Sequence, residues 1–258
     1  MIKSTKVSAI IALIIFCSVN SLAVDIENES ENEGYKYTYN IEEEDAEAYD
    51  PYEKLNRKIF AFNAALDRFT LRPIAVFYKN VTNDYTRDRV RSFADNINTP
   101  LTFVNQVLQT KFNQALKTFW RFTINTTLGV GGLFDIASKF GLNYDRQTFG
   151  NTLAYYGVGP GPYLVLPFFG STNARDVTDS TITNDALNPI KYKLHKDFKS
   201  ALTATKIIHD RATILPFSDH IEKDSTDPYV AVRSAVHQNR ESKVEYPKGF
   251  KYPETSNP

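Results

Sequence analysis

Apolar side chains recur with a helical period in the segment that begins near residue 50. They are spaced three or four residues apart and form one stripe, made of Tyr52, Leu55, Ile59, Phe62, Leu66 and Phe69. This spacing places the stripe on one face of an α-helix, directed either at a membrane or at the protein core. We expect Asp50 to be the N-cap, with Pro51 at the first helical position and Glu53 completing a capping box. Pro73 is expected to end the helix.

The middle of the chain shows the same pattern of periodic segments separated by proline or glycine. One helix is expected over residues 81–97, and a second over residues 99–108 with Pro100 in its first turn. A third helix is expected over residues 112–128. Because this helix has few polar positions it should be the most buried, with Gly129 as its C-cap.

Three more helices are expected toward the C-terminus. A short one follows Asn173 and ends near Asn188, and a longer one covers residues 194–215. The longer helix has one face made of Phe198, Leu202, Thr205 and Ile208. Asp227 and Pro228 are expected to open the last helix as its N-cap and first residue. The chain has no internal repeat and no run of alternating strands, so the predicted fold class is mostly α.

Two glycine-rich stretches interrupt the helical pattern, at residues 128–132 and residues 156–163. Glycine permits positive φ and close approach of the backbone, while the prolines of the second stretch exclude a regular helix. Plain connections between helices and the rim of a binding path remain alternative interpretations. The residues concerned are Gly129, Val130, Gly131, Gly132, Tyr156, Gly157, Gly159, Gly161 and Tyr163.

Charge divides the chain into unlike parts although the formal net charge is zero. Residues 24–50 hold eleven acidic residues and one lysine, and the 208 residues that follow hold 27 basic and 19 acidic residues. We interpret residues 24–49 as an acidic flexible linker, because they contain too few aliphatic side chains to build a core. A basic body suits an anionic surface such as lipid headgroups, although an ordinary solvated surface is an equal alternative. We expect no nucleic-acid partner.

The first 23 residues have the pattern of an export signal. Lys3 and Lys6 precede an apolar run, and small residues stand before a cleavage point after Ala23. Cys17 is the only cysteine, but bulky Phe16 precedes it where lipoprotein processing needs a small residue. We therefore predict an exported chain that begins at Val24 and is not lipidated. No later segment approaches the roughly 20 apolar residues of a membrane span, so any membrane contact must use amphipathic faces.

No catalytic or metal-binding set is recognisable in the sequence. The four histidines form no metal-binding motif, and we interpret the His209–Asp210 pair as an ordinary surface pair. The sequence has no nucleophile elbow, and neither glycine-rich stretch completes a nucleotide-binding fingerprint. We expect no enzyme activity, no metal and no cofactor.

Several blocks of the sequence resemble the MlaA/VacJ family. The first runs from Asp50 to Asn63 and is followed by Arg72-Pro73, and the central block runs from Arg121 to Asp135. A third set of matches lies between Phe149 and Asp176. The resemblance covers about residues 50–189 in one order, which is far more specific than a single glycine motif.

The resemblance implies a ring-like bundle of amphipathic helices that lies in the inner leaflet of a Gram-negative outer membrane, on its periplasmic side, with glycine-rich connecting loops. It implies an amphipathic channel that removes mislocalised phospholipids from the outer leaflet and passes them to a periplasmic carrier protein, in association with a trimeric porin. Members are typically lipoproteins, and Phe16 departs from that pattern. The alternative functions are a non-transporting periplasmic scaffold or porin-associated protein, and a lipid hydrolase for which no catalytic set is visible.

The resulting organisation has four parts. Residues 1–23 are the signal peptide and residues 24–49 the linker. Residues 50–215 form the helical domain that resembles the family. Residues 216–258 form a C-terminal helix and a flexible tail.

Overall fold

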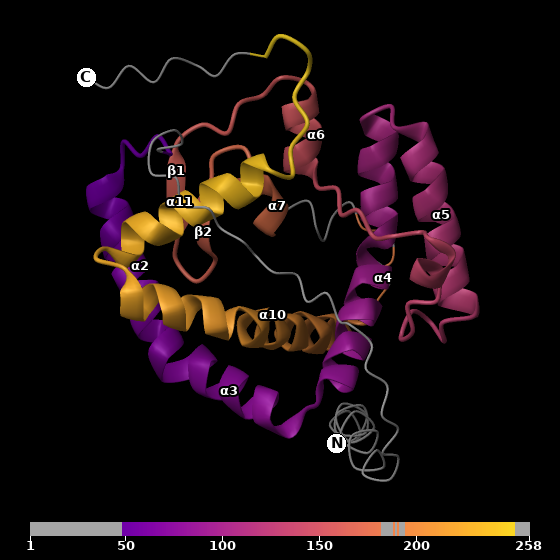
Figure 1. The fold of residues 1–258 in the computed structure, drawn as a ribbon, viewed down its shortest axis with the longest axis horizontal. Helices are drawn as coiled ribbons and strands as arrows, with labels where there is room; N and C mark the ends of the chain where they lie inside the picture. The colour runs from indigo at the N-terminus through magenta and orange to yellow at the C-terminus, as the bar shows by residue number, and fades with distance from the viewer. Residues whose placement is uncertain (1–47, 182–187, 189, 191–193, 251–258) are drawn as a thin grey trace.

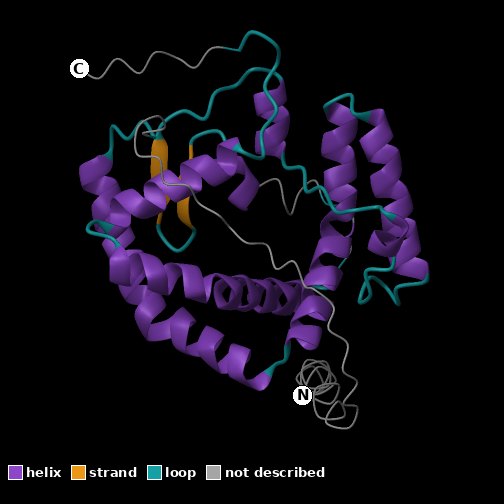
Figure 2. Cartoon of the chain, in the orientation of Figure 1, coloured by secondary structure: helices purple, strands orange, loops and turns teal. Residues whose placement is uncertain are grey.

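Helices dominate the part of the chain that the computed structural model describes, which comprises residues 48–181, 188, 190 and 194–250 (Figure 2). The prediction of a mostly α fold is confirmed. The predicted signal peptide, nearly all of the acidic linker and residues 182–187 of the helix expected between Asn173 and Asn188 lie outside the described residues.

The first helical run changes type without stopping. Helix α2 spans Glu53–Leu66, a π-helical turn η1 spans Asp67–Leu71, and helix α3 spans Arg72–Val81. The predicted end at Pro73 is therefore wrong. Proline is tolerated in the first turn of a helix, where its missing N–H is not needed, and the π turn places Pro73 in the first turn of α3.

Asp50 does not cap α2 as the sequence predicted. The helix begins at Glu53, and its N-cap residue is Tyr52, which makes no side-chain cap hydrogen bond. The carboxylate of Asp50 instead accepts hydrogen bonds from Asn56 Nδ2, at 2.8 Å, and from the hydroxyl of Tyr229. Arg233 lies 3.5 Å from the same carboxylate. Tyr229 and Arg233 belong to helix α11, Pro228–Glu241. Asp50 therefore ties the start of α2 to a helix about 180 residues away in sequence.

The two helices predicted around residues 97 to 99 are one helix, α4, which spans Asp84–Leu108 with Pro100 inside it. Side chains supply donors to the carbonyls of the turn before this proline. Asn98 Nδ2 donates to Ala94 O at 2.9 Å, and Thr99 Oγ1 donates to Asp95 O at 2.8 Å. The helix runs on through Pro100 although this residue has no N–H to donate to the carbonyl of Asn96.

Helix α5, Phe112–Thr127, packs against α4, and the two helices lie at the right of Figure 1. Its predicted burial is wrong, since Phe112, Leu116 and Trp120 are exposed. The buried positions of α5 are Ala115, Thr118, Arg121 and Asn125. The C-cap is Leu128, so the prediction of Gly129 in that role is also wrong.

A small hairpin, which the sequence pattern did not reveal, follows the second glycine-rich stretch. Strands β1, Tyr163–Leu166, and β2, Gly170–Asn173, pair antiparallel with Tyr163 opposite Asn173. A 3₁₀ turn η2, Ala137–Phe140, and helix α6, Phe149–Tyr155, precede the hairpin, and helix α7, Val177–Thr181, follows it.

The C-terminal helices enclose the hairpin from below and in front in the view of Figure 1. Helix α10 spans Lys196–Asp224 and contains Pro216, so its predicted end at Leu215 is wrong. The predicted start of α11 is confirmed, because Asp227 accepts hydrogen bonds from the backbone N–H groups of Tyr229 and Val230 and Pro228 is its first residue.

Helices α2, α3 and α4 follow one another around the periphery of the view, and α10 returns beside α3 (Figure 1). The apolar core is small and divided. One cluster joins α2, the hairpin and α11 through Tyr163, Val165 and Tyr229. The other joins α3 and α10 through Ala75, Ala212 and Leu215.

Candidate functional site

The described part of the chain distributes its side chains in an unusual way. Large apolar side chains are exposed along most of the helices; Phe69 and Phe77, for example, have exposed fractions of 79% and 67%. The largest fully buried side chains, in contrast, are all polar: Gln106, Gln109, Asn56, Asn105, Asn188, Thr99, Thr102 and Asp176. A water-soluble monomer rarely exposes so much large apolar surface, so this distribution indicates a partly apolar environment.

The apolar stripe of α2 is divided between core and surface. Tyr52, Leu55, Phe62 and Phe69 are exposed. Ile59 instead packs against the core cluster that contains Tyr163 and Tyr229. The stripe therefore faces outward over most of its length, and contact of this face with a membrane stays a prediction.

Asparagines occupy the face of α2 that meets the hairpin. Asn56 donates to Tyr163 O and accepts from Val165 N, both at 3.0 Å. Asn63, two turns further on, donates to Leu166 O and accepts from Phe168 N, both at 2.9 Å. Each amide thus satisfies both a donor and an acceptor of the hairpin backbone, and α2 serves as a neighbour to the edge of β1.

A second cluster of buried amides joins α4 to α6. Gln109 Nε2 donates to Gln147 Oε1 at 3.2 Å and to Thr152 Oγ1 at 3.0 Å. Thr152 in turn donates to Asn105 Oδ1 at 2.9 Å. A buried polar network whose members are hydrogen-bonded to one another holds its helices in one arrangement.

The first glycine-rich stretch is fixed to both α4 and α5. Gly132 has φ of +96°, and a Cβ added there would lie 2.4 Å from the side chain of Asn96. Asn96 Nδ2 donates to Thr126 Oγ1 at 3.1 Å and to Gly131 O at 3.2 Å. A Cβ at Gly129 would lie only 2.2 Å from a backbone oxygen of the same turn. Val130, which also has positive φ, is 63% exposed. The turn is therefore tightly packed on its inner side and apolar on its outer side.

A charged pair links α5 to the chain that follows this turn. Arg121 Nη2 pairs with Asp135 Oδ2 at 2.6 Å, and Asn125 Nδ2 donates to Asp135 Oδ1 at 3.0 Å. Burial alone would raise the pKa of Asp135, but hydrogen bonds from Arg121, Ser138 and Asn125 outweigh it and lower that pKa. The charged pair orients the chain that leaves the glycine turn.

The second glycine-rich stretch packs on different elements. Gly157 and Gly161 have positive φ, of +88° and +68°, whereas Gly159 does not. Tyr156 is exposed and its hydroxyl donates to Leu108 O at 2.6 Å, while Tyr163 is buried and starts β1. The stretch therefore links the end of α4 to the hairpin, and a role at the rim of a binding path stays a prediction for both stretches.

His209 lies between α3 and α10 and is only 5% exposed, so its interpretation as a surface residue is wrong. The hydroxyl of Tyr78 lies 3.3 Å from its Nδ1, and burial lowers its pKa. Among the described residues no group of three or more His, Cys, Asp or Glu side chains is arranged to hold a metal ion. His209 is thus a packed core residue of the α3–α10 contact.

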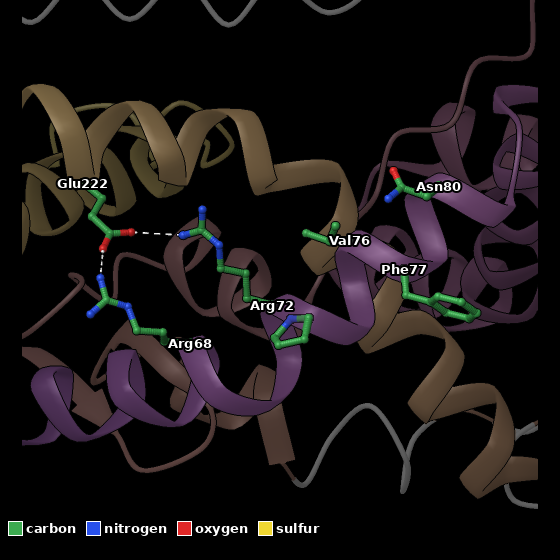
Figure 3. A pocket seen from close by; sticks show the side chains of 7 residues that line it. Arg68, Arg72, Val76, Phe77, Asn80 and Glu222 are labelled. Atoms are coloured by element: carbon green, nitrogen blue, oxygen red, sulfur yellow. Dashed lines mark hydrogen bonds and ion pairs between the residues drawn. The ribbon is translucent and has the colours of Figure 1, made fainter.

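A hollow of about 770 Å³ lies where α3 meets the C-terminal half of α10 (Figure 3). Its charged end contains Arg68, Arg72 and Glu222. Arg68 lies 2.8 Å and Arg72 lies 3.1 Å from the carboxylate of Glu222. Val76 and Phe77 extend the lining along the next turns of α3. The hollow therefore combines charge of both signs with an apolar wall.

The fold and these surfaces define a class of mainly helical protein that exposes many large apolar side chains and buries many polar ones, a distribution suited to contact with lipid. None of the helices in the described ranges has both the length and the apolarity of a transmembrane span. The chain belongs to the MlaA lipoprotein family, whose model matches residues 48–243. The family resemblance noted in the sequence is thereby confirmed.

Individual relatives agree with this assignment. The chain is 57% identical to an uncharacterized protein of Rickettsia conorii over 96% of this chain and 98% of that protein. It is 36% identical to the intermembrane phospholipid transport system lipoprotein MlaA of Escherichia coli, over 74% of this chain and 77% of that protein. A chain from a solved structure concerned with maintenance of bacterial outer membrane lipid asymmetry matches with a TM-score of 0.68 and 34% identity, covering 76% of this chain and 99% of that one.

Proposed function

We propose that this protein is the outer-membrane component of an intermembrane phospholipid transport system, and that it removes mislocalised phospholipids from the outer leaflet through an amphipathic channel. The observation that carries the proposal is the reversed side-chain distribution, with large apolar groups outside and amides and charges inside. The names of the relatives in Escherichia coli and Shigella flexneri support the same function.

The distribution of polar and apolar side chains suits the step that limits phospholipid movement. The free energy of placing a charged headgroup in hydrocarbon without partners is far higher than that of moving the acyl chains, which are already in an apolar environment. A path with polar walls lowers that cost, and an opening toward the lipid lets the acyl chains stay in an apolar environment. No fuel is consumed at such a step, and no catalytic group is needed.

Positively charged side chains around Asp95 suit a phosphate-bearing head. Burial raises the pKa of Asp95 on α4, and the positive charges of Arg146, Lys206 and Arg91 oppose that shift. These cations come from α4, α10 and the segment between η2 and α6, so three parts of the fold direct positive charge to one region. Positive charge favours the phosphate of a lipid head over neutral amphiphiles.

The membrane position follows from the exposed apolar side chains. We infer that the outward residues of α2 and α3 and of the α4–α5 pair lie in the inner leaflet of the outer membrane, on its periplasmic side. The glycine turn at residues 129–132 exposes Leu128 and Val130 beside this surface, with exposed fractions of 65% and 63%. It is our candidate, with residues 156–163, for the channel rim.

The partners in this proposal are phospholipid, a trimeric outer-membrane porin and a periplasmic lipid carrier. The protein acts as a conduit and not as an enzyme. A scaffold that moved no lipid would bind the porin equally well, so lipid movement itself must be measured.

The test compares cells with and without this protein. Cells that lack it should accumulate phospholipid in the outer leaflet, detected with a membrane-impermeant amine reagent, and become sensitive to bile salts. Expression of the wild-type chain should reverse both effects. Restored porin association without a fall in outer-leaflet phospholipid would refute transport and favour the scaffold.

A further inference from the structure

The hollow between α3 and α10 contains more charge than the packing of these helices requires. The helices are already held by the buried contact of Ala75 with Ala212 and Leu215. Arg211 of α10 also holds the turn η1 that precedes α3, since its Nε and Nη2 lie 2.7 Å from the two carboxylate oxygens of Asp67. That pair is the less exposed one, with side-chain exposures of 12% and 26%.

The ion pairs of the hollow lie nearer to solvent. Arg68 and Glu222 have side-chain exposures of 67% and 52%, and Arg72 also lies 3.0 Å from Asp219. Exposed pairs of this kind contribute little to stability, so their partners can be exchanged for those of a ligand at small cost. Figure 3 shows the two guanidinium groups directed at the carboxylate of Glu222.

The balance of charge selects the kind of ligand. Two arginines face two carboxylates, Glu222 and Asp219. A phosphate without a cation would bind the arginines but leave the carboxylates without partners, and unpaired charges oppose binding. A head that carries both a phosphate and an ammonium group replaces both sets of partners. Phosphate is a bidentate match for guanidinium, and ammonium donates to carboxylate.

The apolar part of the hollow suits the rest of such a molecule. Val76 and Phe77 follow the arginines along α3 and have exposed fractions of 40% and 67%. Phe69, one turn before Pro73, is 79% exposed on the same run of helix. An acyl chain that leaves the charged end would therefore lie along exposed apolar side chains.

We propose that this hollow binds the head of a zwitterionic aminophospholipid, with its phosphate on Arg68 and Arg72 and its ammonium group on Glu222. The inference rests on the proposed phospholipid transport and adds a headgroup preference to it. The site discriminates phosphatidylethanolamine from phosphatidylglycerol, because only the first supplies a cation for the carboxylates.

The experiment uses the full chain purified in mild detergent and exposed to an equimolar mixture of phosphatidylethanolamine and phosphatidylglycerol. Retained lipid is quantified by mass spectrometry. The wild type should retain several-fold more phosphatidylethanolamine. Glu222→Gln should remove this preference by retaining less phosphatidylethanolamine and more phosphatidylglycerol, whereas Arg68→Ala with Arg72→Ala should lower both lipids about tenfold.

Two controls separate binding from folding. Arg211→Ala removes the pair with Asp67 outside the hollow, so it should lower the unfolding temperature and leave the ratio of the two lipids unchanged. Glu222 is half exposed, so Glu222→Gln should fold and still test the site if the double arginine variant does not fold. An unchanged lipid ratio in Glu222→Gln would overturn the headgroup site while leaving transport intact. A wild type that retains no phospholipid would refute both proposals.

Discussion

Replacing Gly132 by alanine should destabilise the protein much more than the same change at Gly131. Both glycines have positive φ, of +96° and +70°, so each substitution places an L side chain in a disfavoured backbone conformation. The surroundings differ. A Cβ at Gly131 meets nothing within 4 Å, whereas a Cβ at Gly132 lies 2.4 Å from Cβ and Nδ2 of Asn96.

The magnitude follows from what Asn96 does. Its Nδ2 donates to Thr126 Oγ1 and to Gly131 O, and a shift of the side chain breaks both hydrogen bonds. Backbone strain costs about 1 kcal/mol, and each hydrogen bond contributes about 1 kcal/mol. Gly131→Ala should therefore cost about 1 kcal/mol and Gly132→Ala about 3 kcal/mol, by the same reasoning.

The assay is chemical denaturation of the purified chain in detergent, followed by tryptophan fluorescence, since Trp120 on α5 is the only tryptophan. Asn96→Gly supplies a third variant, because it removes the Cβ that the new methyl group at position 132 would meet. It also loses the two hydrogen bonds by itself, so combined with Gly132→Ala it should cost about 2 kcal/mol less than the sum of the single changes. Equal destabilisation by the two glycine variants, or full additivity with Asn96→Gly, would refute the reasoning.

Three further predictions concern processing, membrane contact and pH. N-terminal sequencing of exported protein should begin at Val24, and a diacylglyceryl group on Cys17 would contradict it. Phe62→Asp should release a folded chain from membranes, because an exposed apolar contact is lost. Ile59→Asp should instead unfold the chain, because it places a charge in the core. Membrane fractionation and circular dichroism distinguish the two outcomes. The lowered pKa of Asp135 means that its ionised carboxylate stabilises the folded state above the ordinary aspartate pKa of 3.8. This contribution to the free energy of unfolding should be lost as the pH falls below 3.8 and through the lowered pKa. Asp135→Asn should remove this part of the acid dependence of unfolding.

Some features of this protein are determined by local sequence. The start of α11 follows from Asp227 and Pro228, because a cap and a first-turn proline act within three residues of each other. The helical character of residues 53–69 follows from periodicity. The family also follows from sequence, because its blocks recur in one order.

Proline alone did not show where the helices end. Pro73, Pro100 and Pro216 all lie within helical runs. A local rule that treats each proline as a break places all three helix ends wrongly, because most of the stability of a helix comes from its packing against other elements. The hairpin was missed because its edge is satisfied by asparagines that precede it by about 105 residues.

The direction of each helical face was decided only by the tertiary structure. A periodic stripe shows that a helix has two faces, but the same stripe can pack in a core or contact lipid. Phe112, Leu116 and Trp120 of α5 are exposed, with Arg121 and Asn125 buried behind them, so this apolar face does not pack in the core. Sequence determined which residues share a face, and the packing of distant segments around buried amides determined which face is inside.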